Sequence, residues 1–159
     1  MKVEKLIKLI FSISICQLAG VMGSIFTAPS IPVWYETLQK PYFSPPNWIF
    51  APVWILLFTL MGISLYLILI ENLNDKAVKI GMAIFSFQLI LNIIWSFLFF
   101  SLQNISYALF EIMILWLAIL LTIYQFWKIN KKSSYLLIPY LLWVTFAAIL
   151  NFTIWRLNI

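Results

Sequence analysis

Long apolar runs separated by short polar segments organise the whole chain. Five of these runs reach the length of about 20 mostly apolar residues that a helix needs to cross the hydrocarbon core of a membrane. They are predicted at 9–26, 48–70, 80–102, 106–127 and 134–157. The connections are short apart from 27–47. The pattern therefore predicts an all-α bundle of five transmembrane helices, forming a single membrane domain over residues 1–159.

Composition agrees with a membrane protein, since 64% of the residues are hydrophobic and only 9% are charged. The basic residues gather on one set of connections: Lys2, Lys5, Lys8, Lys76, Lys79, Lys128, Lys131 and Lys132. Only Lys40 and Arg156 lie on the other side. Because cytoplasmic loops carry the excess of lysine and arginine, we expect a cytoplasmic N-terminus and an outside C-terminus. The basic start followed by an apolar run is also typical of a signal peptide, but no small-x-small cleavage site follows, which favours a retained helix.

The net charge of +5 is explained by this topology and by contact with anionic headgroups, so we expect a lipid bilayer and no nucleic acid as partner. Few glycines and many isoleucines, asparagines and lysines favour an AT-rich microbial genome, and hence a microbial cell membrane.

The connection 27–47 is rich in aromatic residues and contains Trp34, Lys40, Pro41, Pro45 and Pro46. Prolines fix φ and remove a backbone donor, so the segment is predicted to be stiff and extended. An aromatic belt at the membrane interface is the simpler interpretation. A belt alone does not require these prolines, and we therefore favour a structured loop that caps the bundle.

Polar side chains recur at helical spacing inside three of the predicted spans. Residues that share a face are Gln88, Asn92 and Trp95 in the third span, and Trp143, Ala147 and Asn151 in the fifth. Trp54 lies in the second span with Phe50, Phe58 and Met61 near one face. Interhelical hydrogen bonding explains amides in a membrane, and residue type alone favours it. Three such faces around a central space would also form an apolar pocket with a few convergent polar groups.

Several chemistries are excluded by what the sequence lacks. It has no histidine and a single cysteine, Cys16, so no metal site, axial haem ligand or histidine-dependent triad is expected. No glycine-rich phosphate loop is present, and no cofactor is required. Glu111 is the one acid within a predicted span, and we expect it to favour the start of the fourth helix or an interface contact. The small residues Ala19, Gly20, Gly23 and Ser24 indicate close helix packing.

The motifs of the chain, taken together and in order, resemble the translocator protein family, also called tryptophan-rich sensory proteins or peripheral-type benzodiazepine receptors. The residues that carry the resemblance are Trp34-Tyr35, Leu38-Gln39-Lys40-Pro41, Pro45-Pro46, Trp48, Ala51-Pro52-Val53-Trp54, Met61-Gly62, Gln88-Leu89, Leu91-Asn92, Trp95, Phe99-Phe100, Pro139-Tyr140-Leu141, Trp143-Val144, Phe146-Ala147, Leu150-Asn151, Trp155-Arg156 and Asn158.

The resemblance implies a receptor- or sensor-like protein that binds a porphyrin-type tetrapyrrole inside the bundle, with synthetic isoquinoline or benzodiazepine ligands as further candidates. By motif it places Trp54, Asn92, Trp95, Trp143 and Ala147 at that pocket, and Gln88 and Asn151 lie on the same faces. Transport by a homodimer, light-dependent porphyrin degradation assisted by Trp54 and Trp143, and a structural partner role stay open. The family's sterol pattern has Phe152 in place of tyrosine, which puts sterol recognition in doubt.

Overall fold

The computed structural model describes residues 2–159 and contains helices and loops, with no strand in that range. The helices are α1 (Lys2–Ser30), η1 (Tyr35–Thr37), α2 (Asn47–Leu69), α3 (Lys76–Ser96), η2 (Phe97–Ser101), α4 (Ile105–Ile129), α5 (Lys131–Leu136) and α6 (Ile138–Leu157). Five helical segments, α3 with η2 and α5 with α6 counting as one each, are long and apolar enough to cross a membrane. The predicted all-α membrane bundle is confirmed.

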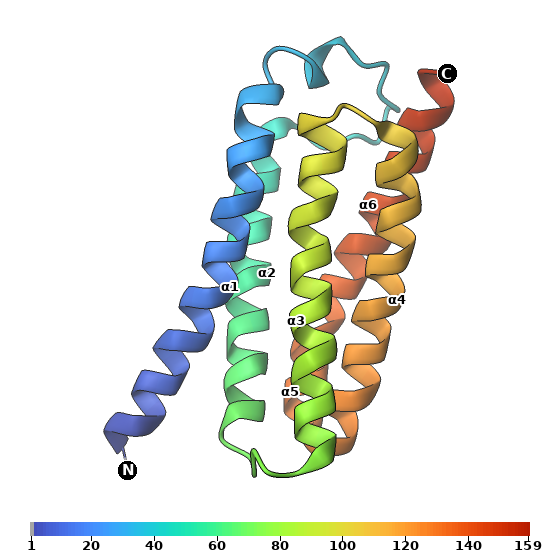
Figure 1. Cartoon of the computed structure of the whole chain (residues 1–159). Coiled ribbons are helices and arrows are strands. Elements are labelled where there is room, and N and C mark those ends of the chain that lie inside the picture. The colour runs from blue at the N-terminus through green and yellow to red at the C-terminus, as the bar shows by residue number, and fades with distance from the viewer. Residues whose placement is uncertain (1) are drawn as a thin grey trace.

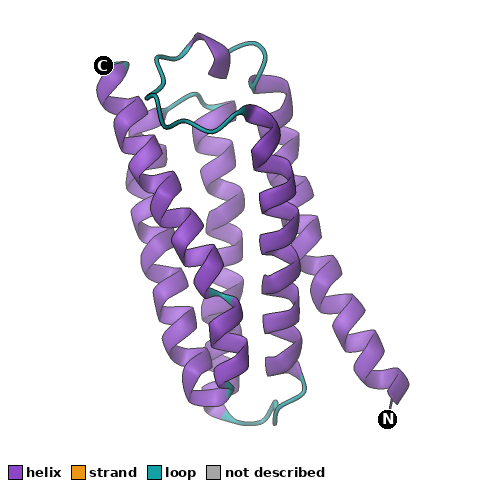
Figure 2. Ribbon diagram, turned by 180° about the vertical axis from the view of Figure 1, so that it is seen from behind, coloured by secondary structure: helices purple, strands orange, loops and turns teal. Residues whose placement is uncertain are grey.

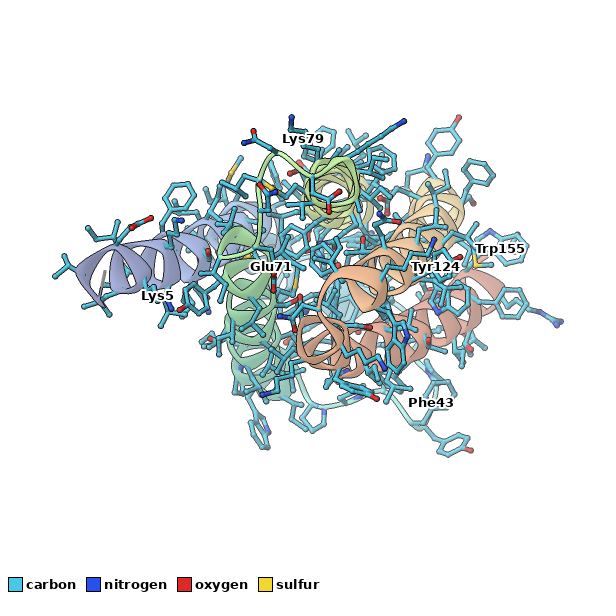
Figure 3. All side chains as sticks on the ribbon, turned by 90° about the horizontal axis from the view of Figure 1, so that it is seen from below. Lys5, Phe43, Glu71, Lys79, Tyr124 and Trp155 are labelled. Carbon is cyan, nitrogen blue, oxygen red and sulfur yellow. The ribbon has the colours of Figure 1, made fainter. Side chains whose placement is uncertain are left out.

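The five segments stand side by side, and the two termini lie at opposite ends of the bundle (Figure 1). α1 packs on α2 and α3, α3 packs on α4, and α4 packs on α6. The ring closes where α5 packs on α2, whereas α2 and α6 meet at few positions. Seen along its axis from the end that carries Lys5, Glu71 and Lys79, the bundle surrounds an interior filled with side chains, and the start of α1 splays away from it (Figure 3).

The helices extend beyond the predicted spans, most clearly in α1, which runs over Lys2–Ser30 where 9–26 is predicted. Hydropathy locates only the part of a helix that lies in hydrocarbon. The first turns of α1 are polar, and a Lys8–Glu4 ion pair of 3.0 Å one turn apart supports them. The other segments begin and end within a few residues of the predicted bounds.

The fifth span is interrupted where a single helix is predicted. α5 ends at Leu136 and α6 begins at Ile138, with a turn at Leu137 between them (Figure 2). Pro139 explains the break, since a proline lacks the amide that would continue the ladder and fits best in the first turn of a helix. Pro52, by contrast, lies inside α2 without interrupting it.

Two contacts fix how closely the helices approach one another. A Cβ at Gly62 in α2 would lie 2.5 Å from the Ile13 Cα in α1, so α1 and α2 touch backbone to backbone at this point. At the α2–α5 contact, Ser64 and Ser133 are buried and each hydroxyl donates to the other residue's backbone oxygen, at 2.9 and 2.8 Å. These contacts lock α5 to α2, while α6 continues past the turn without such a bond to α2 among the described residues.

The buried apolar side chains form two groups. The main cluster fills most of the bundle and includes Met61, Phe85, Leu115 and Val144. The outer cluster lies under the loop between α1 and α2; its buried members are Tyr35, Phe99, Phe100, Ala108, Leu150 and Ile154. Trp95 packs against both clusters and therefore marks the level at which they meet.

Candidate functional site

Three of the predicted polar residues of the third and fifth spans, Asn92, Trp95 and Asn151, make hydrogen bonds inside the bundle. The Asn92 side-chain amide donates to the Tyr140 hydroxyl oxygen at 3.0 Å. The Trp95 indole N–H donates to the Asn151 side-chain oxygen at 3.1 Å, and the Asn151 amide donates to the Ile105 carbonyl at 3.2 Å. The Asn92–Tyr140 and Trp95–Asn151 bonds connect α3 to α6, which are not neighbours in the ring, so these two bonds cross the interior, whereas the Asn151–Ile105 bond joins α6 to the start of the neighbouring α4. The interhelical hydrogen bonds that residue type favours are present.

Aromatic rings from α2 and α6 form a wall beside these polar pairs. Trp54 stacks on Phe58 with ring centroids 5.4 Å apart, and its edge meets Tyr140 at 6.2 Å. Trp143 contacts Phe50 at 6.0 Å and Phe146 at 5.5 Å. Both tryptophans and Ala147 are half-buried and pack against the main cluster. The structure thus brings the three predicted faces together, with indole and phenyl rings on one side and amides on the other.

Only three of the seven predicted ligand residues, Asn92, Trp95 and Asn151, have a side-chain hydrogen bond in the part of the chain that the structure describes. Gln88 is 1% exposed, and neither its amide nitrogen nor its oxygen makes a hydrogen bond. Ala147 has no polar group and provides only space between Trp143 and Asn151 on α6. The unpaired Gln88 amide carries a real energetic cost in hydrocarbon, because nothing there replaces the bonds it would make in water.

The residues of the predicted pocket are packed against each other. Two of the hollows of the structure have volumes of about 360 Å³ and about 310 Å³. Both lie away from the predicted site: one is lined by α6 residues from Phe152 to Leu157, the other by the end of α1 together with Trp34 and the end of η2. A flat ligand inside the bundle would therefore have to separate the aromatic wall from the polar pairs.

The loop between α1 and α2 crosses the outer end of the bundle (Figures 1 and 2). Its Trp34 ring meets Phe99 edge-on at 5.5 Å, and the Lys40 ammonium lies 4.5 Å from the centre of the Tyr35 ring. At its far end the backbone amide of Gln39 donates to the side-chain oxygen of Asn158 at 3.0 Å. The side-chain amide of Asn158 in turn donates to the backbone carbonyl of Gln39 at 2.9 Å. The loop is thus fastened to the C-terminal end of α6.

The prolines of this loop shape its return to the bundle. The Ser44 amide bonds the Pro41 carbonyl at 3.0 Å in a tight turn, and Pro46 is the residue before α2. Pro45 lies between them and is half-buried.

Tyr35 belongs to the same loop and is buried. Its burial raises the pKa of the phenol above the ordinary value, because the charged form loses water there.

Two residues that matter for the site were not predicted to do so. Tyr140 is fully buried and supplies the acceptor for Asn92; its position one turn before Trp143 and two turns before Ala147 was the available signal. Glu111 was expected near the dipole end of α4, but Asn104 is the residue that caps this helix, its side chain accepting from the Tyr107 amide at 3.0 Å. Of the two alternatives expected for Glu111, capping is wrong, and its side chain is instead buried among the helices, 6% exposed.

Comparison with known proteins identifies the fold family. The model of the TspO/MBR family matches residues 12–156. The chain belongs to this family. The tryptophan-rich protein TspO of Archaeoglobus fulgidus is 48% identical over 96% of this chain and 98% of its own length, and that of Chlorobaculum tepidum is 41% identical over 98% of both. The human translocator protein is 35% identical over 89% of this chain and 85% of its own.

TspO/MBR membership and the five apolar helices together make this chain an integral membrane protein. The names of the relatives, tryptophan-rich sensory protein and translocator protein among them, fit a membrane sensor or receptor role. An interior bounded by aromatic rings and amides suits a hydrophobic ligand.

Proposed function

We propose that this TspO/MBR protein binds a porphyrin-type tetrapyrrole between α2, α3 and α6, as a membrane sensor or receptor. The observation that supports the proposal most strongly is the pair of hydrogen bonds that crosses the interior, Asn92 to Tyr140 and Trp95 to Asn151. These groups face an aromatic wall that contains Trp54 and Trp143. A flat apolar ring with polar substituents would stack on the indoles and take over the amides as hydrogen-bond partners.

Ligand access is proposed from the side where α2 and α6 meet least. On the N-terminal side of the turn at Leu137, α5 is held to α2 by the Ser64–Ser133 pair. On the C-terminal side of the turn, aromatic contacts such as Trp54–Tyr140 and Phe50–Trp143 provide the main link between α2 and α6. Rotation of aromatic side chains costs less than breaking the hydroxyl–carbonyl hydrogen bonds between Ser64 and Ser133. The contact between α2 and α6 is therefore the part of the ring that opens most easily.

The proposed topology follows from the arrangement of charge. The lysines predicted on the inside lie at the end of the bundle that carries the start of α1, the α2–α3 connection and the α4–α5 junction (Figure 3). We place that end in the cytoplasm and the loop 31–46 outside a microbial cell membrane. A homodimer is the proposed assembly, with synthetic isoquinoline and benzodiazepine compounds as further ligand candidates.

Quenching of tryptophan fluorescence by protoporphyrin, titrated in the dark, tests the proposal. Trp143→Ala should weaken binding about tenfold or more, because it removes the ring between Phe50 and Phe146. Trp116→Ala and Trp48→Ala are the controls: Trp116 bonds Thr145 away from the site and Trp48 is 73% exposed. Equal loss in all three variants, each shown to be folded, would contradict the site. Absence of saturable quenching in the unmodified protein would remove tetrapyrrole from the function.

Two further measurements distinguish a sensor or receptor from a porphyrin-degrading enzyme and from a transporter. Under illumination in air, a new absorbing product that requires both Trp54 and Trp143 and is absent without oxygen would indicate porphyrin degradation, with molecular oxygen as the oxidant and indole as electron donor to the excited porphyrin. Movement of bound porphyrin across reconstituted vesicles would indicate transport, whereas saturable binding without flux or product supports a sensor or receptor.

A further inference from the structure

The junction between α4 and α5 carries lysines whose ammonium groups lie over aromatic rings. The Lys128 ammonium lies 4.0 Å from the centre of the Tyr124 ring, and the Lys131 ammonium lies 5.3 Å from the centre of the Trp127 ring. Tyr135 on α5 meets Trp127 edge-on, with ring centroids 5.2 Å apart. All five side chains are exposed on the outside of the bundle. Cation–π contact of this kind holds in one place a lysine side chain that would otherwise move freely.

The two ammonium groups lie on one side of the junction. Tyr124 and Trp127 are three residues apart on α4, so their rings share a face of that helix, and each ring carries one of the lysines. Hydrogen bonds fix the start of α5 relative to α4: the Asn130 side-chain oxygen accepts from the backbone amides of Lys132 and Ser133, at 3.1 and 3.3 Å. An ordered turn of the chain therefore holds two positive charges next to each other.

No carboxylate within residues 2–159 forms an ion pair with these two lysines. The ion pair of that range joins Lys8 to Glu4, on the splayed start of α1. Glu71 reaches the junction from the α2–α3 connection, but its carboxylate accepts a hydrogen bond from the Asn130 side-chain amide at 3.0 Å. The two charges are therefore available to an anion from outside the chain.

The surface beside the lysines suits hydrocarbon. Towards the middle of the membrane, α4 exposes Leu117, Leu120 and Leu121 on the face that continues to Tyr124. Tyrosine and tryptophan rings prefer the depth at which hydrocarbon gives way to headgroups. A soluble anion would match the lysines alone, whereas a phospholipid matches both the charged and the apolar part of this face.

We propose that the α4–α5 junction is a binding site for one anionic phospholipid. The lipid phosphate lies between the ammonium groups of Lys128 and Lys131, and an acyl chain lies along the exposed leucines of α4. Basic residues near a membrane surface attract anionic lipid in general. Here the rings hold both ammonium groups in place, which reduces the entropy lost on binding and makes this junction tighter than other lysines at the same end of the bundle. The site is separate from the interior and independent of tetrapyrrole binding.

Two double variants remove the same charge from the same end of the bundle. Lys128→Gln with Lys131→Gln changes the proposed site, and Lys76→Gln with Lys79→Gln at the start of α3 is the matched control. Neither control lysine lies over an aromatic ring in the part of the chain that the structure describes. Lys79 also lies apart from Tyr124 when the bundle is viewed from this end (Figure 3).

Native mass spectrometry of the detergent-purified protein, titrated with dioleoyl phosphatidylglycerol or dioleoyl phosphatidylcholine, measures the affinity for each lipid. The unmodified protein should bind the first phosphatidylglycerol about tenfold more tightly than the first phosphatidylcholine. The Lys128/Lys131 variant should lose this preference by weakening phosphatidylglycerol alone, whereas the Lys76/Lys79 variant should keep most of it. Trp127→Leu removes a ring and leaves both charges, so it should lose part of the preference.

Three results would overturn the proposal. Equal affinity of the unmodified protein for the two lipids would show that the junction does not select an anionic headgroup. Equal loss in the two double variants would show attraction by net charge and not by this junction. Displacement of phosphatidylglycerol by inorganic phosphate at equal concentration would show that a soluble anion occupies the lysines. None of these results bears on tetrapyrrole binding, which the quenching titration tests separately.

Discussion

At the scale of single residues, the interior hydrogen bonds are the feature on which both stability and binding depend. Asn92 and Tyr140 bond each other where no water is available, so neither group has an alternative partner. Such bonds in membrane proteins contribute on the order of 0.6–2 kcal/mol. The same bonds must be exchanged for bonds to a ligand, so the free energy of binding is a difference between two sets of similar interactions.

Tyr140→Phe should lower the free energy of unfolding by about 1 kcal/mol, since the Asn92 amide then loses its acceptor while the ring stays in place. Thermal unfolding in detergent measures the change. Tyr107→Phe is the matched control, because Tyr107 is 65% exposed on α4. If both variants melt like the unmodified protein, the Asn92–Tyr140 bond does not stabilise the bundle.

Helical spacing was sufficient to place Gln88, Asn92 and Trp95 on one face, and the structure brings that face inside. The partner of each group could not be predicted in the same way. Tyr140 meets Asn92 only because α6 is rotated to a particular angle opposite α3, and that rotation depends on packing around the whole ring. The absence of a partner for Gln88 and Glu111 is likewise a property of the assembled bundle.

At the scale of elements, small residues set the distance between neighbouring helices. Gly62→Ala should destabilise the protein by about 2 kcal/mol or more, because the new methyl group would lie 2.5 Å from the backbone of Ile13 and α1 would have to move. Gly23→Ala is the matched control: its Cβ would lie 3.1 Å from the Ser96 hydroxyl oxygen, a side-chain atom that can rotate away. Chemical or thermal unfolding compares them, and a larger loss in Gly23→Ala would contradict the account.

The number and order of the helices could be predicted from hydropathy, but two features of them could not. α1 continues beyond the predicted span at both ends, and at its N-terminal end the Lys8–Glu4 ion pair supports polar turns that hydropathy does not detect. The break at Leu137 depends on Pro139 and on the lock between Ser64 and Ser133, which fixes α5 separately from α6. Pro52 shows that a proline alone does not predict such a break.

At the scale of the whole molecule, the loop 31–46 joins the outer end of the bundle into one unit. Its attachment to α6 is the paired hydrogen bond between Gln39 and Asn158, residues far apart in sequence. The aromatic contacts of Trp34 and Tyr35 with Phe99 attach the other end of the loop to the end of α3 and η2. A ligand beneath the loop would be shielded from the aqueous phase at that end of the bundle.

Asn158→Ala should increase hydrogen exchange of the Gln39 amide by tenfold or more, because that amide loses its acceptor. Asn158→Asp keeps the accepting oxygen and should preserve most of the protection. Exchange of amides in the middle of α4 serves as the internal reference. Unchanged exchange at Gln39 in the alanine variant would show that the loop is held by its aromatic contacts alone.

Binding inside the bundle can be observed in the indole N–H spectrum of the ¹⁵N-labelled protein during titration with protoporphyrin. If the ligand enters the bundle, the Trp95 signal should shift saturably, because the ligand must replace its bond to Asn151, and so should the signal of Trp143 in the aromatic wall. The signals of Trp116 and Trp155, bonded to Thr145 and Ser106 at the α4–α6 contact, should stay in place. Shifts confined to the exposed Trp48 and Trp127, with Trp95 and Trp143 unchanged, would show that porphyrin binds the surface and not the interior of the bundle.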